Sequence, residues 1–108
     1  MDNDRPDHEL RIPGFCWVLL LETRADARPG ETEALVEGFR RQAALVGGDC
    51  TVTGGPTEWL GEVRHPEGSL TNTEAMTLLA WLEAQPAFAH ARFGPQEDRR
   101  LARKTQLG

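Results

Sequence analysis

Apolar side chains dominate residues 15–22, where they occupy both alternating sets of positions. One set consists of Phe15, Trp17, Leu19 and Leu21, and the other of Cys16, Val18 and Leu20. A strand that is apolar on both faces is typical of the middle of a sheet, where both sides are covered. We therefore predict a central, buried strand over 15–22.

Two later segments have apolar residues at helical spacing, and we predict helices over 31–46 and 72–85. The first stripe is Leu35, Val36, Phe39, Ala43 and Val46, and the second is Ala75, Leu78, Leu79 and Leu82, with Trp81 at its edge. Thr71 followed by Glu74 matches the capping box that opens a helix, which supports the start of the second one.

Three shorter segments alternate between apolar and polar residues. Residues 50–53 and 57–64 flank the turn Gly54-Gly55-Pro56 and predict a hairpin. In its second strand Trp59, Gly61 and Val63 share one face, and Glu58, Leu60, Glu62 and Arg64 share the other. Residues 87–93 predict a last strand, which Gly94-Pro95 should end.

The element order is therefore β-α-β-β-α-β, which is the ferredoxin-like arrangement of the α+β class. It predicts a four-stranded antiparallel sheet with both helices on one face. The other face would stay open to a partner or a second subunit. The same order would also suit another α/β sandwich, so the strand order is less secure than the element order.

Charge divides the 108-residue chain into three parts. The net charge is −5, to which an acidic arm (1–13) contributes −2, the domain (14–94) −5 and a basic tail (95–108) +2. We predict that the arm is disordered or loosely attached and that the tail is disordered or a short helix. Because nucleic-acid binding depends on cationic side chains, RNA contact is expected only through the tail, at Arg99, Arg100, Arg103 and Lys104.

No apolar run approaches the length of a membrane-spanning helix, and the acidic start does not resemble a signal peptide. We therefore expect a cytoplasmic protein without a membrane partner. Cys16 and Cys50 are expected to be free thiols.

The chain has few candidates for catalytic chemistry. His8, His65 and His90 lie at no metal-ligand spacing, and the glycine pairs match no phosphate-binding pattern. Cys50 with His65 would suit a nucleophile and its base, and Glu58 with Glu62 would suit an acid–base pair, but structural or solvated roles explain all four. We predict no catalytic, cofactor or metal site. Trp59 follows a glycine turn and is a candidate partner-binding residue at the open face or at a mouth of the sheet.

Three stretches resemble the YggL family of small bacterial proteins. They are Gly14-Phe15-x-Trp17, Gly54-Gly55 followed by Trp59-x-Gly61, and the helix that starts at Thr71 and ends Trp81-Leu82-Glu83. The likeness covers 14–94 and implies a non-enzymatic protein that binds the large ribosomal subunit. Members of that family begin with a basic arm, whereas this chain begins with an acidic one, so its rRNA contact would fall to the tail.

Three functions thus stay open from the sequence. The first is a YggL-like accessory protein of the ribosome. The second is a small acidic module of the immunity, inhibitor or sensor kind, which would bind a protein or ligand on the open sheet face as a monomer or homodimer. The third is an enzyme, which would need Cys50, His65 and a carboxylate to converge.

Overall fold

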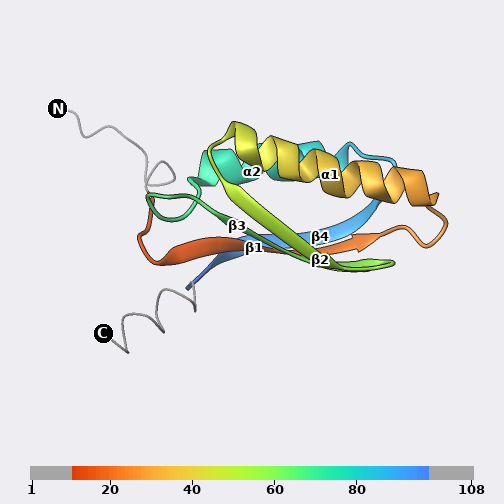
Figure 1. The fold of residues 1–108 in the computed structure, drawn as a ribbon, viewed down its shortest axis with the longest axis horizontal. Coiled ribbons are helices and arrows are strands. Elements are labelled where there is room, and N and C mark those ends of the chain that lie inside the picture. Colours follow the sequence, from red (N-terminus) through yellow and green to blue (C-terminus); the bar gives the residue numbers. More distant parts are fainter. Residues whose placement is uncertain (1–10, 98–108) are drawn as a thin grey trace.

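The structure, a computed structural model, describes residues 11–97. Its elements are β1 (Phe15–Thr23), α1 (Pro29–Leu45), β2 (Asp49–Gly54), β3 (Glu58–Arg64), α2 (Asn72–Glu83) and β4 (Phe88–Glu97). The four strands form one antiparallel sheet in the order β2-β3-β1-β4, and the two helices lie side by side on one face of it (Figure 1). The described chain is therefore an α+β structure, as predicted, with β1 in the interior of the sheet.

Local sequence explains where the helices begin. Pro29 occupies the first turn of α1, where its missing N–H costs no hydrogen bond, so the helix starts two residues earlier than predicted. In α2 the predicted capping box is present: Glu74 N donates to Thr71 Oγ1 at 3.1 Å and Thr71 N donates to Glu74 Oε1 at 3.0 Å.

The core lies between the helices and one face of the sheet. Its fully buried side chains include Leu19, Leu35, Phe39, Val63, Leu78 and Leu82. Trp17 is also buried, and its Nε1 donates to Leu70 O at 3.2 Å, so the one polar atom of the ring has a partner. The ring of Phe93 lies 4.9 Å from that of Trp17 and 6.1 Å from that of Phe39, joining β4 to the same core.

Close approach of the two helices depends on Gly38. A Cβ built on this residue would lie 2.4 Å from Cη2 and 2.6 Å from Cζ2 of Trp81. The indole ring therefore occupies the space that a side chain at position 38 would need. This contact joins α1 to α2 and explains a glycine in the middle of a helix, where it is otherwise unfavourable.

The prediction that β1 is buried on both faces is wrong. Cys16 is buried, but Val18 is only half-buried and Leu20 is 47% exposed. Both helices cover the same side of the sheet, which receives Trp17, Leu19 and Leu21. No helix or strand of residues 11–97 covers the other side, so the second apolar set of β1 lies on an open face.

The last strand is longer than predicted. β4 continues through Gly94 and Pro95 to Glu97, which pairs with Phe15. Pro95 is tolerated because β4 is at the edge of the sheet, where a residue without an N–H need not break a ladder on both sides. The first three residues of the predicted tail thus belong to the sheet. The rest of the tail lies outside the described residues.

Residues 11–13, which the sequence analysis assigned to the arm, are attached to the start of α2. The Arg11 guanidinium donates to both carboxylate oxygens of Glu74, at 2.8 and 2.9 Å, and Ile12 N donates to Ser69 Oγ at 3.0 Å. Positions 1–10 of the predicted arm lie outside the described residues. The domain therefore begins at least three residues before Gly14.

Candidate functional site

The open face of the sheet has an exposed apolar centre. Leu20 of β1 and Leu60 of β3 are directly opposite one another in the antiparallel register, and they are 47% and 43% exposed. Their side chains lie on the same face because residues paired across neighbouring strands point the same way. A pair of large aliphatic groups in contact with solvent is the kind of surface that marks an interaction site when polar residues surround it.

A hollow lies beside this pair, between β1 and β4. It is an open cavity of about 260 Å³ lined by Val18, Leu20, Arg92, Phe93, Gly94 and Gln96. Gly94 is paired with Val18, and a Cβ built on Gly94 would have no atom within 4 Å. The hollow is therefore present because position 94 has no side chain to fill it.

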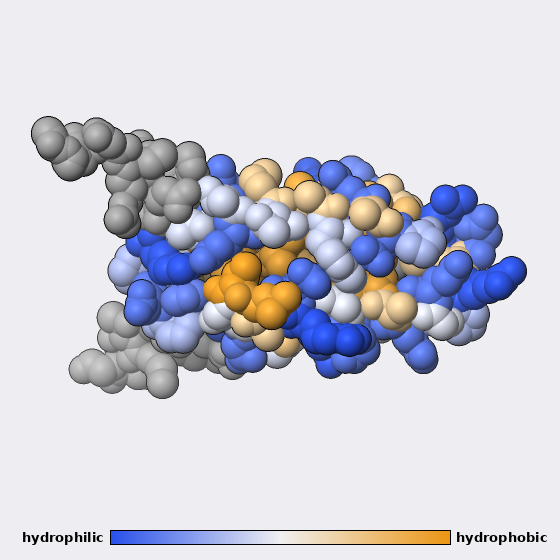
Figure 2. All heavy atoms as spheres, turned by 90° about the horizontal axis from the view of Figure 1, so that it is seen from above, coloured by the Kyte–Doolittle hydropathy of each residue, from blue (hydrophilic) through white to orange (hydrophobic). Residues whose placement is uncertain are grey.

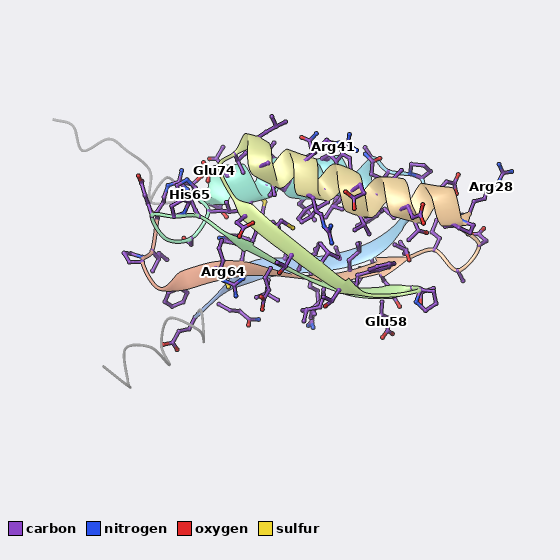
Figure 3. The ribbon with its side chains drawn as sticks, in the orientation of Figure 1. Arg28, Arg41, Glu58, Arg64, His65 and Glu74 are labelled. Atoms are coloured by element: carbon purple, nitrogen blue, oxygen red, sulfur yellow. The ribbon has the colours of Figure 1, made fainter. Side chains whose placement is uncertain are left out.

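Charged residues surround the apolar centre unevenly. On the β3 side, Glu58 and Glu62 stand on either side of Leu60, and Figure 3 shows Glu58 pointing away from the helices. On the β4 side, His90 and Arg92 are the charged or titratable residues of the same face. Glu62 accepts from Arg64 at 2.9 Å. The open face thus carries Glu58 and the Glu62–Arg64 pair along β3, and Arg92 along β4.

Trp59 does not lie on the open face. Its ring packs against the core on the helix side, beside the β2–β3 turn, and its Nε1 donates to Thr23 Oγ1 at 3.3 Å. A Cβ at Gly55 would lie 2.9 Å from this ring. The prediction of Trp59 at the open face is wrong because it belongs to the inward set of β3. A partner contact at the end of the sheet stays a prediction.

The pKa of Cys50 and the hydrogen bond of His65 argue against a nucleophile and its base. Burial raises the pKa of the Cys50 thiol to about 11, against the opposing effect of Arg40. A thiol with that pKa is protonated at neutral pH, whereas a catalytic cysteine needs the thiolate. His65 Nδ1 instead accepts from Glu67 N at 3.1 Å, beside the start of α2 where Figure 3 shows His65 and Glu74 together.

Within residues 11–97, the remaining candidate acid–base and metal-ligating residues do not come together in one site. Glu58 and Glu62 are separated by Leu60 along the strand, and Glu62 is ion-paired with Arg64, so the two carboxylates do not lie side by side. No group of three or more metal-ligating side chains occurs in the described part of the chain. His8 and the basic residues Arg99, Arg100, Arg103 and Lys104 lie outside it.

The opposite side of the molecule has its own apolar patch. Figure 2 looks onto the helices and shows an orange patch at the C-terminal end of α1. The large hydrophobic residues exposed on the helices are Leu45, at 77%, and Met76, at 44%. Leu45 and Met76 provide matched positions for control substitutions.

The residues that define the open face were not predicted as site residues from the sequence. The signal for Leu60 was present, since it is the one apolar residue among Glu58, Glu62 and Arg64 on the outward set of β3. Gly94 was interpreted as a strand end, whereas it lies within β4 and forms the hollow. Arg92 lies beside the hollow only because β4 is next to β1.

No helix of residues 11–97 is long and apolar enough to cross a membrane. Comparison with protein-family models found no match, and comparisons with curated proteins and with solved structures found none either.

Proposed function

We propose that this chain is a non-enzymatic, cytoplasmic binding module that docks a protein partner on the open face of a ferredoxin-like sheet. The observation that carries the proposal is the cross-strand pair Leu20–Leu60, exposed on both strands at the centre of the face. Burial of such groups against a partner removes apolar area from water, which is the main driving force of protein association.

The strand order supports the ferredoxin-like assignment. β1 and β2 both run antiparallel to β3, so they share a direction and α1 connects them across β3. In the same way β3 and β4 both run antiparallel to β1, and α2 connects them across β1. Two such interleaved crossovers make the split β-α-β arrangement.

Size and charge favour a protein over other ligands. The hollow, at about 260 Å³, is smaller than the roughly 300–1,000 Å³ of ordinary small-molecule pockets. The carboxylates of Glu22, Glu58 and Glu62 would repel the phosphates of a nucleic acid laid across the centre of the face. An apolar centre with a charged rim is the usual composition of a protein–protein interface.

Affinity capture with matched variants tests this proposal. Leu20→Asn with Leu60→Asn makes the open face polar, and Leu45→Asn with Met76→Asn does the same to the helix patch. We expect a stoichiometric protein partner captured by the wild type and by the helix-patch variant, and lost from the open-face variant. Equal capture by all three folded proteins would refute the open face as the docking surface.

A second candidate function is association with the large ribosomal subunit. It is favoured by the basic cluster Arg99, Arg100, Arg103 and Lys104 and by the resemblance to the YggL family. Because β4 extends to Glu97, the tail should be removed after this residue, so that the sheet is left whole. We expect co-sedimentation with 50S particles at low salt that fails at high salt and without the tail. No co-sedimentation at low salt would rule it out.

A further inference from the structure

We propose that the partner on the open face is a second copy of this chain, packed face to face about a two-fold axis parallel to β1. This inference rests on the proposed function and names its partner. It follows from an asymmetry of the face: the β3 side carries Glu58 and Glu62, whereas the β4 side is hollowed at Gly94 and carries Arg92.

The register fixes which residues would meet. A two-fold axis along β1, midway between two stacked sheets, places the β3 side of one copy over the β4 side of the other and keeps each residue at its own level along the strands. Leu20 is paired with both Leu60 and Arg92, so these two share a level. Val18 is paired with both Glu62 and Gly94, which share the next one.

Apolar groups of the two copies meet under this operation. Leu60 is 43% exposed on the β3 side. The hollow around Gly94 recedes on the β4 side, next to the level of Leu60. Rotation about the axis parallel to β1 sets each Leu60 over Arg92 of the other copy, which lines the hollow, and the two Leu20 side chains meet at the axis. The apolar groups of both copies then form one central cluster.

Charge is complementary under the same operation. Glu58 is paired with Glu22, and Glu22 is paired with His90, so the rotation sets Glu58 of one copy over His90 of the other. Arg92 lies at the level of Leu60, between the levels of Glu58 and Glu62, so it is within reach of both carboxylates of the partner. Arg92 therefore lies between two carboxylates of the partner's β3, and this contact occurs twice because the interface is two-fold.

The alternative axis, across the strands at the level of Leu20, is disfavoured by the same charges. It would lay β3 on β3 in opposite directions and set Glu58 of one copy over Glu62 of the other. Like charges placed opposite one another at an interface cost free energy. The axis along β1 avoids these two contacts between Glu58 and Glu62, although it sets the two Glu22 side chains against each other next to the Leu20 pair.

Charge reversal by mixing tests this geometry. Arg92→Glu sets a carboxylate against Glu58 of the partner at both symmetric contacts, and Glu58→Arg sets a guanidinium against Arg92. A heterodimer of the two variants restores an opposite-charge pair at both contacts. Analytical ultracentrifugation from about 1 to about 100 μM would measure the mass of each protein and of the mixture. Leu45→Asn serves as the control on the helix face.

We expect the wild type and Leu45→Asn to reach twice the 12.0 kDa monomer mass at the upper concentrations. The dimer dissociation constant of each charge-reversed variant alone should be at least about tenfold higher than that of the wild type. The mixture of the two variants should recover the dimer. A wild type that stays monomeric throughout would overturn the second-copy proposal, as would a dimer that neither substitution affects. If the wild type is monomeric but captures a partner that the variant Leu20→Asn with Leu60→Asn does not capture, the second-copy proposal fails and the proposed function stands.

Discussion

Replacement of Gly38 by alanine tests the helix packing directly. In an exposed helix this change stabilises by about 1 kcal/mol, because alanine has the higher helix propensity. Here the new Cβ would lie 2.4 and 2.6 Å from two carbons of the Trp81 ring, whereas carbon atoms in contact sit roughly 3.5–4.0 Å apart. The ring must move by about 1 Å, and overpacking of this kind costs about 1–3 kcal/mol. We therefore expect a net loss of about 1 kcal/mol.

The sign of the effect should reverse when the ring is removed. In a Trp81→Leu background the space beside position 38 is free, so Gly38→Ala should stabilise by up to about 1 kcal/mol. Urea unfolding of the four proteins in the cycle measures the difference, which should be about 1–3 kcal/mol. The reasoning is refuted if Gly38→Ala changes the free energy of unfolding equally in both backgrounds.

Three further predictions concern the start of α2 and the thiol. Arg11 lowers the pKa of Glu74, so their pairing stabilises the protein above the unfolded pKa of glutamate, about 4.3, and is lost as pH falls through the lower folded value. Arg11→Ala should cost about 1 kcal/mol at pH 7 and much less at pH 3, as measured by urea unfolding; an equal cost at both pH values would contradict the pairing. Thr71→Ala should cost about 1 kcal/mol through loss of the cap, and an unchanged midpoint would show that the cap contributes nothing. Cys50, with a pKa of about 11, should react slowly with a disulfide reagent at pH 8 by peptide mapping, and fast labelling of the folded protein would show that the thiol is accessible and ionised.

The secondary structure was predictable because each element carries a local signal. The stripe from Leu35 to Ala43 indicates α1, and Thr71 with Glu74 indicates the start of α2. The alternation of Trp59, Gly61 and Val63 indicates β3. These signals depend on spacing along the chain, and the structure confirms the elements that they predict.

Features that depend on contacts between distant residues were not predictable in this way. Gly38 gives no sign in the sequence that it accommodates Trp81, because the two are 43 positions apart. The apolar set of Val18 and Leu20 suggested burial, since the sequence does not say on which side the helices lie. Local rules predict a break at Gly94 and Pro95, but the chain continues as a strand there because its pairing with β1 extends to Glu97.

The candidate site was predictable only as a face, not as a set of residues. A β-α-β-β-α-β order implies that one side of the sheet is open, and the structure has such an open side. The register was needed to place Leu60 beside Leu20 and Arg92 beside the hollow. Trp59 was predicted as a partner-binding residue because it follows a glycine turn, but its position in the inward set of β3 directs it to the core.

The most direct test of the open face as a binding surface is amide NMR at increasing protein concentration. We expect concentration-dependent shifts at Val18, Leu20, Leu60 and Arg92, and none at Leu45 on the helix face. The shifts should vanish in Leu20→Asn with Leu60→Asn, whose remaining spectrum should show an intact fold. Spectra that do not change with concentration would contradict the second-copy dimer, and shifts confined to Leu45 and its neighbours would contradict the open face itself.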